Sequence, residues 1–300
     1  MSRRQDSIIV VRFPLKRYFF RGRGCSIFFV FAANIGYTSA MRILMLGDVF
    51  GRPGRMALKN HLPALREKFG AEIVIANGEN ASGGVGLTLE GLRELLAAGV
   101  DVVTGGNHIW RHKDVYGALD KEPRLLRPAN YPPGAPGRGL GLFDLPGGRK
   151  VAVMNLLGRV FVEGVDCPFR AAEALLAQIP AEVRVRVVDF HAEASSEKKA
   201  LGWFLDGKIS LLAGTHTHVQ TNDARILPQG AGYLTDLGMC GVEDSVIGMD
   251  AKSSVERFVS GLPVAFKPAK GAAGISGLWA DIDEASGRAV ALELVNIPAA

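Results

Sequence analysis

The stretch MRILMLGDVFGRPGR, residues 41–55, contains the first repeat of the pattern that decides the fold. Its apolar run over 42–47 is continuous, which is typical of a strand covered on both faces. The following residues, 54–70, have an amphipathic pattern that begins after Pro53, a favourable first helical position, and stops at Gly70. We therefore expect a buried strand followed by a helix.

The same order continues along the chain. Apolar runs at 72–77 and 101–106 flank an amphipathic segment with Thr88 as candidate N-cap and Gly99 as its stop. This βαβαβ order predicts right-handed crossovers and a largely parallel sheet. Further elements are expected as buried runs at 151–158, 185–190 and 209–214, helices at 169–178 and 251–262, a hairpin turning at Gly147-Gly148, a second hairpin in 224–236 and a closing strand pair in 274–297. One layered α/β domain with two sheets over 41–300 accounts for this pattern.

The charge of the chain is unevenly distributed. The 300 residues carry a net charge of +5, but residues 1–40 contain seven Lys or Arg and one acidic residue. The remainder, 41–300, therefore has 28 basic and 29 acidic residues, close to neutral. A basic footprint for nucleic acid on the body of the protein is not supported.

The first forty residues read differently from the rest. They are basic and aperiodic up to Gly24, and the apolar run after it is too short to span a bilayer. We interpret 1–40 as a non-core extension from an over-extended start, with Met41 as the natural first residue; a targeting segment is the alternative. Three dispersed cysteines form no CxxC pair, which indicates no disulfide partners and a cytoplasmic location.

Polar side chains follow five of the predicted strands where those strands end. They are Asp48, Glu79 with Asn80, Asn107 with His108, His191, and the pair His216 and His218. In open α/β sheets ligands bind beyond the carboxyl ends of the strands, so these residues can converge. In an extended backbone, positions two apart face the same way, so the final pair could grip one ligand or two neighbouring ones. Carboxylate, amide and imidazole donors without thiolate suit Mn, Fe or Zn, and eight candidates suffice for two ions.

Each residue taken alone has a simpler interpretation. Asp48 could be a turn acid, His108 a helix cap and His191 a core histidine, and the His-x-His pair could be polar residues of a wet loop. Taken together, five such strand ends favour a metal site. The other histidines, His61 within a helix and His112 past a loop, are interpreted as surface or helix residues.

The order GDVF, NGEN, GGNH, a lone His and GTHTH resembles the calcineurin-type metallophosphoesterase pattern. The chain departs from that pattern at three positions: Phe50 replaces a histidine, Glu79 replaces the bridging aspartate, and Thr215 precedes the final pair. In these departures it resembles the bacterial YmdB-like phosphodiesterases. The resemblance covers residues 41 to about 297. It implies a four-layer α/β/β/α sandwich of two mixed sheets with a dinuclear metal centre.

The resemblance also implies roles for the strand-end residues. One ion would take Asp48, Glu79, Asn80 and His218, and the other would take Glu79, Asn107, His191 and His216. Asn80 would replace the histidine lost at Phe50, and His108 would be the general acid. Two divalent ions, Fe or Mn with Zn as a further option, would activate a bridging hydroxide that attacks a 2′,3′-cyclic nucleotide or an RNA-derived phosphodiester.

Other interpretations remain open. The alternative function is a metal-bound regulatory protein that binds RNA or partner proteins with little turnover. A nucleotide-binding module is disfavoured, because neither GDVFGRPG nor SGGVG has a phosphate-loop spacing. Arg159 could contact a phosphate or be structural, and residues 235–250 could form a lid or a subunit contact. We expect a homo-oligomer and no membrane partner.

Overall fold

The computed structural model describes residues 11–13, 16–18, 40–265 and 267–299. Contacts divide the chain into two units, Met1–Tyr37 and Thr38–Ala300. In the first unit, β1 (Val11–Phe13) and β2 (Lys16–Tyr18) pair antiparallel. The interpretation of 1–40 as an over-extended start falls mainly outside the described residues and stays a prediction. The remaining paragraphs concern the second unit.

The first sheet contains the predicted opening strands. Its order is β4-β13-β14-β3-β5-β6, and β15 pairs with the other edge of β14. The strands are β3 (Ala40–Leu46), β4 (Asp48–Val49), β5 (Ile73–Asn77), β6 (Val102–Thr104), β13 (Met239–Val242), β14 (Ala273–Asp283) and β15 (Arg288–Ile297). The β3–β5–β6 pairings are parallel as predicted, whereas β14 runs antiparallel to β3 and β15, so the sheet is mixed.

The second sheet has the order β11-β12-β10-β9-β8-β7. The strands are β7 (Leu140–Leu145), β8 (Arg149–Leu157), β9 (Val185–His191), β10 (Leu211–Thr215), β11 (Arg225–Ile226) and β12 (Gly232–Leu234). Four central strands, β8, β9, β10 and β12, are parallel, and the two predicted hairpins supply the antiparallel edges. Both sheets therefore bring the carboxyl ends of parallel strands to one rim.

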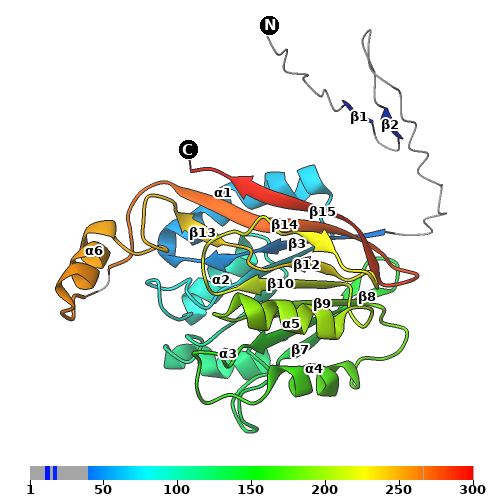
Figure 1. The fold of residues 1–300 in the computed structure, drawn as a ribbon, viewed down its shortest axis with the longest axis horizontal. Helices are drawn as coiled ribbons and strands as arrows, with labels where there is room; N and C mark the ends of the chain where they lie inside the picture. Colours follow the sequence, from blue (N-terminus) through cyan, green and yellow to red (C-terminus); the bar gives the residue numbers. More distant parts are fainter. Residues whose placement is uncertain (1–10, 14–15, 19–39, 266, 300) are drawn as a thin grey trace, which may run out of the picture. The chain divides into compact units, whose positions relative to one another are not determined.

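Helices cover the outer face of each sheet (Figure 1). They are α1 (Gly51–Phe69), α2 (Leu89–Ala97), a 3₁₀ turn (Lys113–Val115), α3 (Tyr116–Lys121), α4 (Pro168–Leu176) and α5 (Ser195–Leu205). The remaining helix, α6 (Ala251–Ser260), lies to one side of the sheets, and Ser254 is its only buried residue. Thr88 caps α2 as predicted by accepting a hydrogen bond from the Gly91 amide. α1 begins at Gly51, earlier than the prediction, because the Gly51 amide donates to Asn80 O in a neighbouring loop. None of the helices in the described ranges is both long and apolar enough to cross a bilayer.

Three apolar clusters separate the layers. Leu44 and Val74 pack with Leu58 of α1 and Leu92 of α2 on the outer face of the first sheet. The second cluster lies between the two sheets and includes Ile43, Met45, Val187 and Leu211. The third lies under α4 and α5 and includes Met154, Phe190, Leu175 and Leu201. Neighbouring residues of β3 thus enter different clusters, which explains its continuous apolar sequence. The four-layer α/β/β/α prediction is confirmed (Figure 1).

The segment 235–250 is partly a structural element. Its residues 239–242 form β13, which pairs with β4 and β14 and buries Cys240 completely. A lid is therefore the wrong interpretation for this part of the segment, since removing it would open the sheet. The later residue Ile247 is half exposed and lies beside the rim described next.

Candidate metal centre

The structure brings the residues predicted at the five strand ends to one rim. Asp48 follows β3, Glu79 and Asn80 follow β5, and Asn107 and His108 follow β6 of the first sheet. From the second sheet come His191, the last residue of β9, and His216 and His218, which follow β10. Close polar contacts link all eight side chains into one network.

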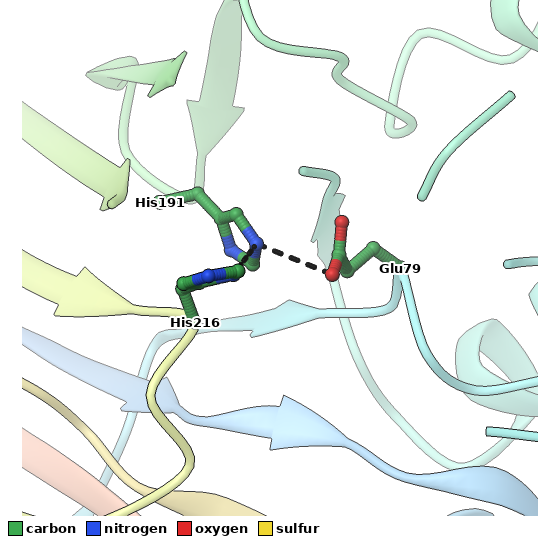
Figure 2. A group of neighbouring side chains, drawn as sticks. All are labelled: Glu79, His191 and His216. Atoms are coloured by element: carbon green, nitrogen blue, oxygen red, sulfur yellow. Dashed lines mark hydrogen bonds and ion pairs between the residues drawn. The ribbon is translucent and has the colours of Figure 1, made fainter. Parts of the chain in front are cut away.

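One half of the rim is closely packed around His191. Its Nε2 lies 3.2 Å from Glu79 Oε1, 3.1 Å from Asn107 Oδ1 and 3.0 Å from His216 Nδ1. Figure 2 shows Glu79, His191 and His216 pointing toward one another from separate segments. One ligand atom from each of these three lies within 4.8 Å of the others. A ring nitrogen carries at most one hydrogen, so it cannot satisfy three such neighbours by hydrogen bonding.

The other half of the rim contains Asp48, Asn80 and His218. Asp48 Oδ2 accepts a hydrogen bond from the His216 amide (3.0 Å), but Oδ1 is fully buried and has no hydrogen-bond partner within the described residues. Two imidazole nitrogens, His218 Nε2 and His191 Nδ1, each lie 3.7 Å from Oδ1, and His218 Nε2 also lies 3.2 Å from Asn80 Nδ2. A buried carboxylate oxygen without a partner is costly unless a cation compensates it. The oxygen and nitrogen donors here fit a divalent ion.

Each of the three imidazoles uses its second nitrogen for an oxygen acceptor. His218 Nδ1 donates to Ile247 O (2.8 Å), and His216 Nε2 lies 3.0 Å from Glu193 Oε2. His191 Nδ1 lies 2.9 Å from Thr215 Oγ1. Such contacts orient metal-binding histidines and leave the other nitrogen as the donor to a metal. This arrangement therefore directs three imidazole nitrogens into the rim.

A buried polar network supports His191 from behind. Thr215 Oγ1 donates to Asp189 Oδ1 (2.7 Å), while Asn77 Nδ2 (3.0 Å) and Thr104 Oγ1 donate to Asp189 Oδ2. The sequence interpretation missed Asp189, although it lies two positions before His191 and so shares its face of β9. Burial raises the pKa of Asp189 to about 6.

The loop carrying His216 and His218 has an unusual backbone. β10 ends at Thr215, and the two histidines have φ values of 98° and 64°, in the left-handed region that non-glycine residues rarely adopt. The prediction that extended backbone aligns the pair is therefore wrong. The loop is instead held through Thr217, whose N and Oγ1 donate to Asp236 Oδ2 at 3.2 and 2.8 Å. Strained backbone of this kind is characteristic of functional sites.

The rim holds two carboxylates whose ionisation the neighbouring imidazoles favour. Burial opposes ionisation of Glu79, but His191 and His108 together outweigh it and hold the pKa of that carboxyl well below its usual range. Burial also opposes ionisation of Asp48, yet His218 and His191 together leave its pKa lowered overall. Burial disfavours charged His191, but the carboxylates raise its pKa to about 9; burial lowers the pKa of His216 to about 4. Two ionised carboxylates thus attract cationic partners.

His108 stands at the exposed edge of the rim. Its amide donates to Glu79 Oε2 (2.8 Å), and its Nδ1 lies 3.0 Å from Glu79 Oε1 and 2.9 Å from Asn80 Oδ1. The side chain is 39% exposed, unlike the buried His191. With Nδ1 engaged, Nε2 is the nitrogen available to a bound molecule.

Two neighbouring positions shape the space around these residues. Phe50, where the calcineurin-type metallophosphoesterase pattern has a histidine, is buried and packs edge-on against His218, with ring centroids 5.5 Å apart. A Cβ at Gly106 would lie 2.2 Å from Glu79 Oε2 and 2.4 Å from His191 Nε2, so a side chain there would displace the rim residues. The second glycine of GGNH is thus required because the Glu79 and His191 side chains approach its backbone closely.

The histidines interpreted as non-ligands lie outside the network. His61 is an exposed residue of α1, and His112 Nε2 lies 3.2 Å from Val85 O. For Arg159 the structure shows a backbone contact, its amide donating to Glu197 Oε1 (3.1 Å).

Comparisons with known proteins identify the family of the chain. The profile of the YmdB-like proteins matches residues 44–295. The chain is 46% identical over 257 residues to a Bacillus subtilis protein named 2′,3′-cyclic-nucleotide 2′-phosphodiesterase, covering 86% of this chain and 97% of the relative.

Two crystal structures have the same fold over most of the chain. A hypothetical protein from Thermus thermophilus superposes with a TM-score of 0.80 at 43% identity, covering 86% of this chain and 100% of that one. A structure described as a novel phosphatase from Mycoplasma pneumoniae gives a TM-score of 0.81 at 34% identity, covering 86% and 94%. The chain belongs to the YmdB-like protein family.

Proposed function

We propose that this chain is a metal-dependent phosphodiesterase that hydrolyses 2′,3′-cyclic nucleotides. The name of the Bacillus relative supports the reaction and the substrate class. The observation that carries the metal requirement is the fully buried Asp48 Oδ1, which has no hydrogen-bond partner in the described part of the chain and faces His218 Nε2. A divalent cation at the rim would satisfy that oxygen.

The two halves of the rim would hold one ion each. Asp48, Asn80 and His218 would bind the first, Asn107, His191 and His216 the second, and Glu79 would contribute to both; Fe or Mn is the expected metal, with Zn also compatible. When bound, two divalent cations lower the pKa of a water and neutralise charge on the phosphoryl oxygens.

The chain itself supplies the proton for the leaving group. Water adds to phosphorus, the bond from phosphorus to one ribose oxygen breaks, and that oxygen requires a proton. We assign its delivery to Nε2 of His108, because Nδ1 is held by Glu79 and Asn80 and the side chain reaches solvent. Such general acid catalysis contributes about 10² to 10⁴ in rate.

Hydrolysis of bis-p-nitrophenyl phosphate and of 2′,3′-cyclic AMP with added Mn²⁺ tests the proposal. Asp48→Ala should lose the metal of its half of the rim together with activity, whereas His108→Ala should keep the metal and lose about 10² to 10⁴ in kcat. The exposed residues Asp144 and His61 provide matched controls, Asp144→Ala and His61→Ala.

The outcomes separate the alternatives. Full turnover by both site variants would contradict the proposal. Wild-type protein that retains metal but hydrolyses neither substrate would instead support the regulatory alternative. The homo-oligomer and the cytoplasmic location stay predictions.

A further inference from the structure

A second polar cavity lies at the opposite end of the strands that carry the candidate metal centre. It has a volume of about 220 Å³ and is lined by four cationic residues, Arg184, Arg186, Lys208 and Arg288, together with Gln229 and Ser286. Arg184 directly precedes β9, and seven residue steps of extended chain separate it from His191, which corresponds to about 23 Å. The cavity is therefore distinct from the rim. We call it the amino-end cavity.

The walls of the amino-end cavity are built by three converging segments. Arg186, at the start of β9, donates to backbone carbonyls, its Nε to Val183 O (3.0 Å) and its Nη1 to Lys208 O (3.3 Å). Ser210 joins the same strands, because its Oγ accepts from the Arg186 amide (3.0 Å) and donates to Arg184 O (3.3 Å). These contacts fix the backbone that carries the cations.

The third wall is the β14–β15 turn. Gly287 has a φ of 73°, and a Cβ there would lie 2.5 Å from Arg184 O, so the turn can approach β9 this closely only with glycine. Arg184 also donates to Ala285 O in this turn. The approach places Arg288 beside Arg184 in one cavity wall.

The four cations of the amino-end cavity have no acidic partner. Within the part of the chain that the structure describes, no salt bridge involves any of them. The nearby carboxylates are used elsewhere: Asp206 accepts from the Gln229 and Ala231 amides, and Asp283 accepts from Ser286 Oγ. Because residues 41–300 are nearly neutral overall, this concentration of positive charge is a local feature.

We propose that the amino-end cavity binds a multiply charged phosphate group. Arginine presents a planar fork of donors that matches phosphate oxygens, and three of the four cations are arginines. The volume is below the roughly 300 to 1,000 Å³ that encloses a whole drug-sized ligand. The cavity therefore takes the phosphate of its ligand and leaves any organic part outside. Free phosphate and the phosphates of a nucleotide share this chemistry.

Calorimetric titration of the metal-loaded enzyme with inorganic phosphate and with ADP tests the proposal. The variant is Arg184→Gln with Arg288→Gln, and the control is Lys59→Gln with Arg93→Gln, two exposed cations on α1 and α2 that give the same charge change. We expect binding to weaken about tenfold or more in the cavity variant and to be unchanged in the control. Tighter binding of ADP identifies a nucleotide source, and equal binding identifies free phosphate.

Two further measurements keep the result separate from the metal centre. The cavity variant should retain wild-type hydrolysis of bis-p-nitrophenyl phosphate, which also shows that it folds. Asp48→Ala should retain the cavity binding even where activity is lost. Unchanged affinity in the cavity variant, or an equal loss in the control, would overturn the proposal.

Discussion

The two halves of the candidate metal centre differ in how completely their residues are paired. In the half around His191, Nε2 has three neighbours within 3.2 Å. In the half around Asp48, one carboxylate oxygen has no hydrogen-bond partner among the described residues, and the facing His218 nitrogen is 3.7 Å away. One polar atom is crowded and another is isolated, and a cation on each side would relieve both conditions.

One residue beside the Asp48 half contributes no polar atom to it. Phe50 stands where the calcineurin-type metallophosphoesterase pattern has a histidine, and its ring packs against His218 without offering a metal donor. The neutral carboxamide of Asn80 would complete that half through Oδ1, which lies 2.9 Å from His108 Nδ1. We therefore expect the Asp48 half to bind its ion more weakly than the His191 half.

Removing the shared residue should abolish both halves. Glu79→Ala takes away the carboxylate that faces His191 and contacts Asn80, so both ions should be lost. Since two bound ions would supply several kcal/mol of transition-state stabilisation, activity should fall by at least about 10³-fold. Metal analysis beside the hydrolysis assay measures both effects, with the exposed Glu94→Ala as control. Retention of two ions by Glu79→Ala would refute its bridging role.

Single substitutions should separate the halves. Asp48→Ala should lower the metal content to about one ion per chain, because the His191 half keeps its donors. His191→Ala should remove the more tightly bound ion. This variant should therefore retain less metal during dialysis than Asp48→Ala does. Competition with a chelator, followed for each variant, gives the order of affinities. Equal retention by both variants would show that the halves are not distinct.

Breaking one buried ion pair should weaken metal binding in both halves together. Lys198 Nζ lies 2.6 Å from Asp236 Oδ2, and the same carboxylate oxygen binds Thr217, between His216 and His218. Lys198→Met would leave a buried charge without its partner and lower the free energy of unfolding by about 3–5 kcal/mol.

Urea denaturation and metal titration check this expectation. The matched control is Lys199→Met, since the neighbouring lysine is 58% exposed and 3.5 Å from its acidic partner. A variant at Lys198 that is as stable as the Lys199 control would argue against this support for the loop.

The smallest effect should come from the support behind His191. Thr215→Val removes the hydroxyl between His191 Nδ1 and Asp189, and loss of such support weakens metal binding about 10- to 100-fold. Thr104→Val is the matched control, because the Thr104 hydroxyl donates to the other oxygen of Asp189. Metal titration should show weaker binding of the ion in the His191 half for Thr215→Val and unchanged binding for Thr104→Val. Equally weakened binding in both variants would mean that the hydrogen bonds to Asp189, and not the contact with His191, support metal binding.

Most of the layered fold could be predicted from the sequence. Continuous apolar runs identify strands such as β3 that pack on both faces, and the strand ends identify Asp48 or His191 without knowledge of the structure. The antiparallel pairing of β14 with β3 was not predictable, because register between segments more than 200 residues apart depends on the whole sheet.

The backbone of the site was harder to predict than its residue types. The φ values of His216 and His218 are set by distant contacts, above all the Asp236 carboxylate at Thr217. Acceptors such as Ile247 O and Glu193 lie in loops with no motif of their own. Sequence spacing identifies donors, whereas their orientation depends on tertiary packing.

The number of metal ions per chain tests the central claim most directly. Elemental analysis of wild-type protein, loaded with Mn²⁺ and then dialysed, should give about two ions per chain, one for each half of the rim. A value that never exceeds trace levels, or that remains at two in the Glu79→Ala variant, would contradict the account.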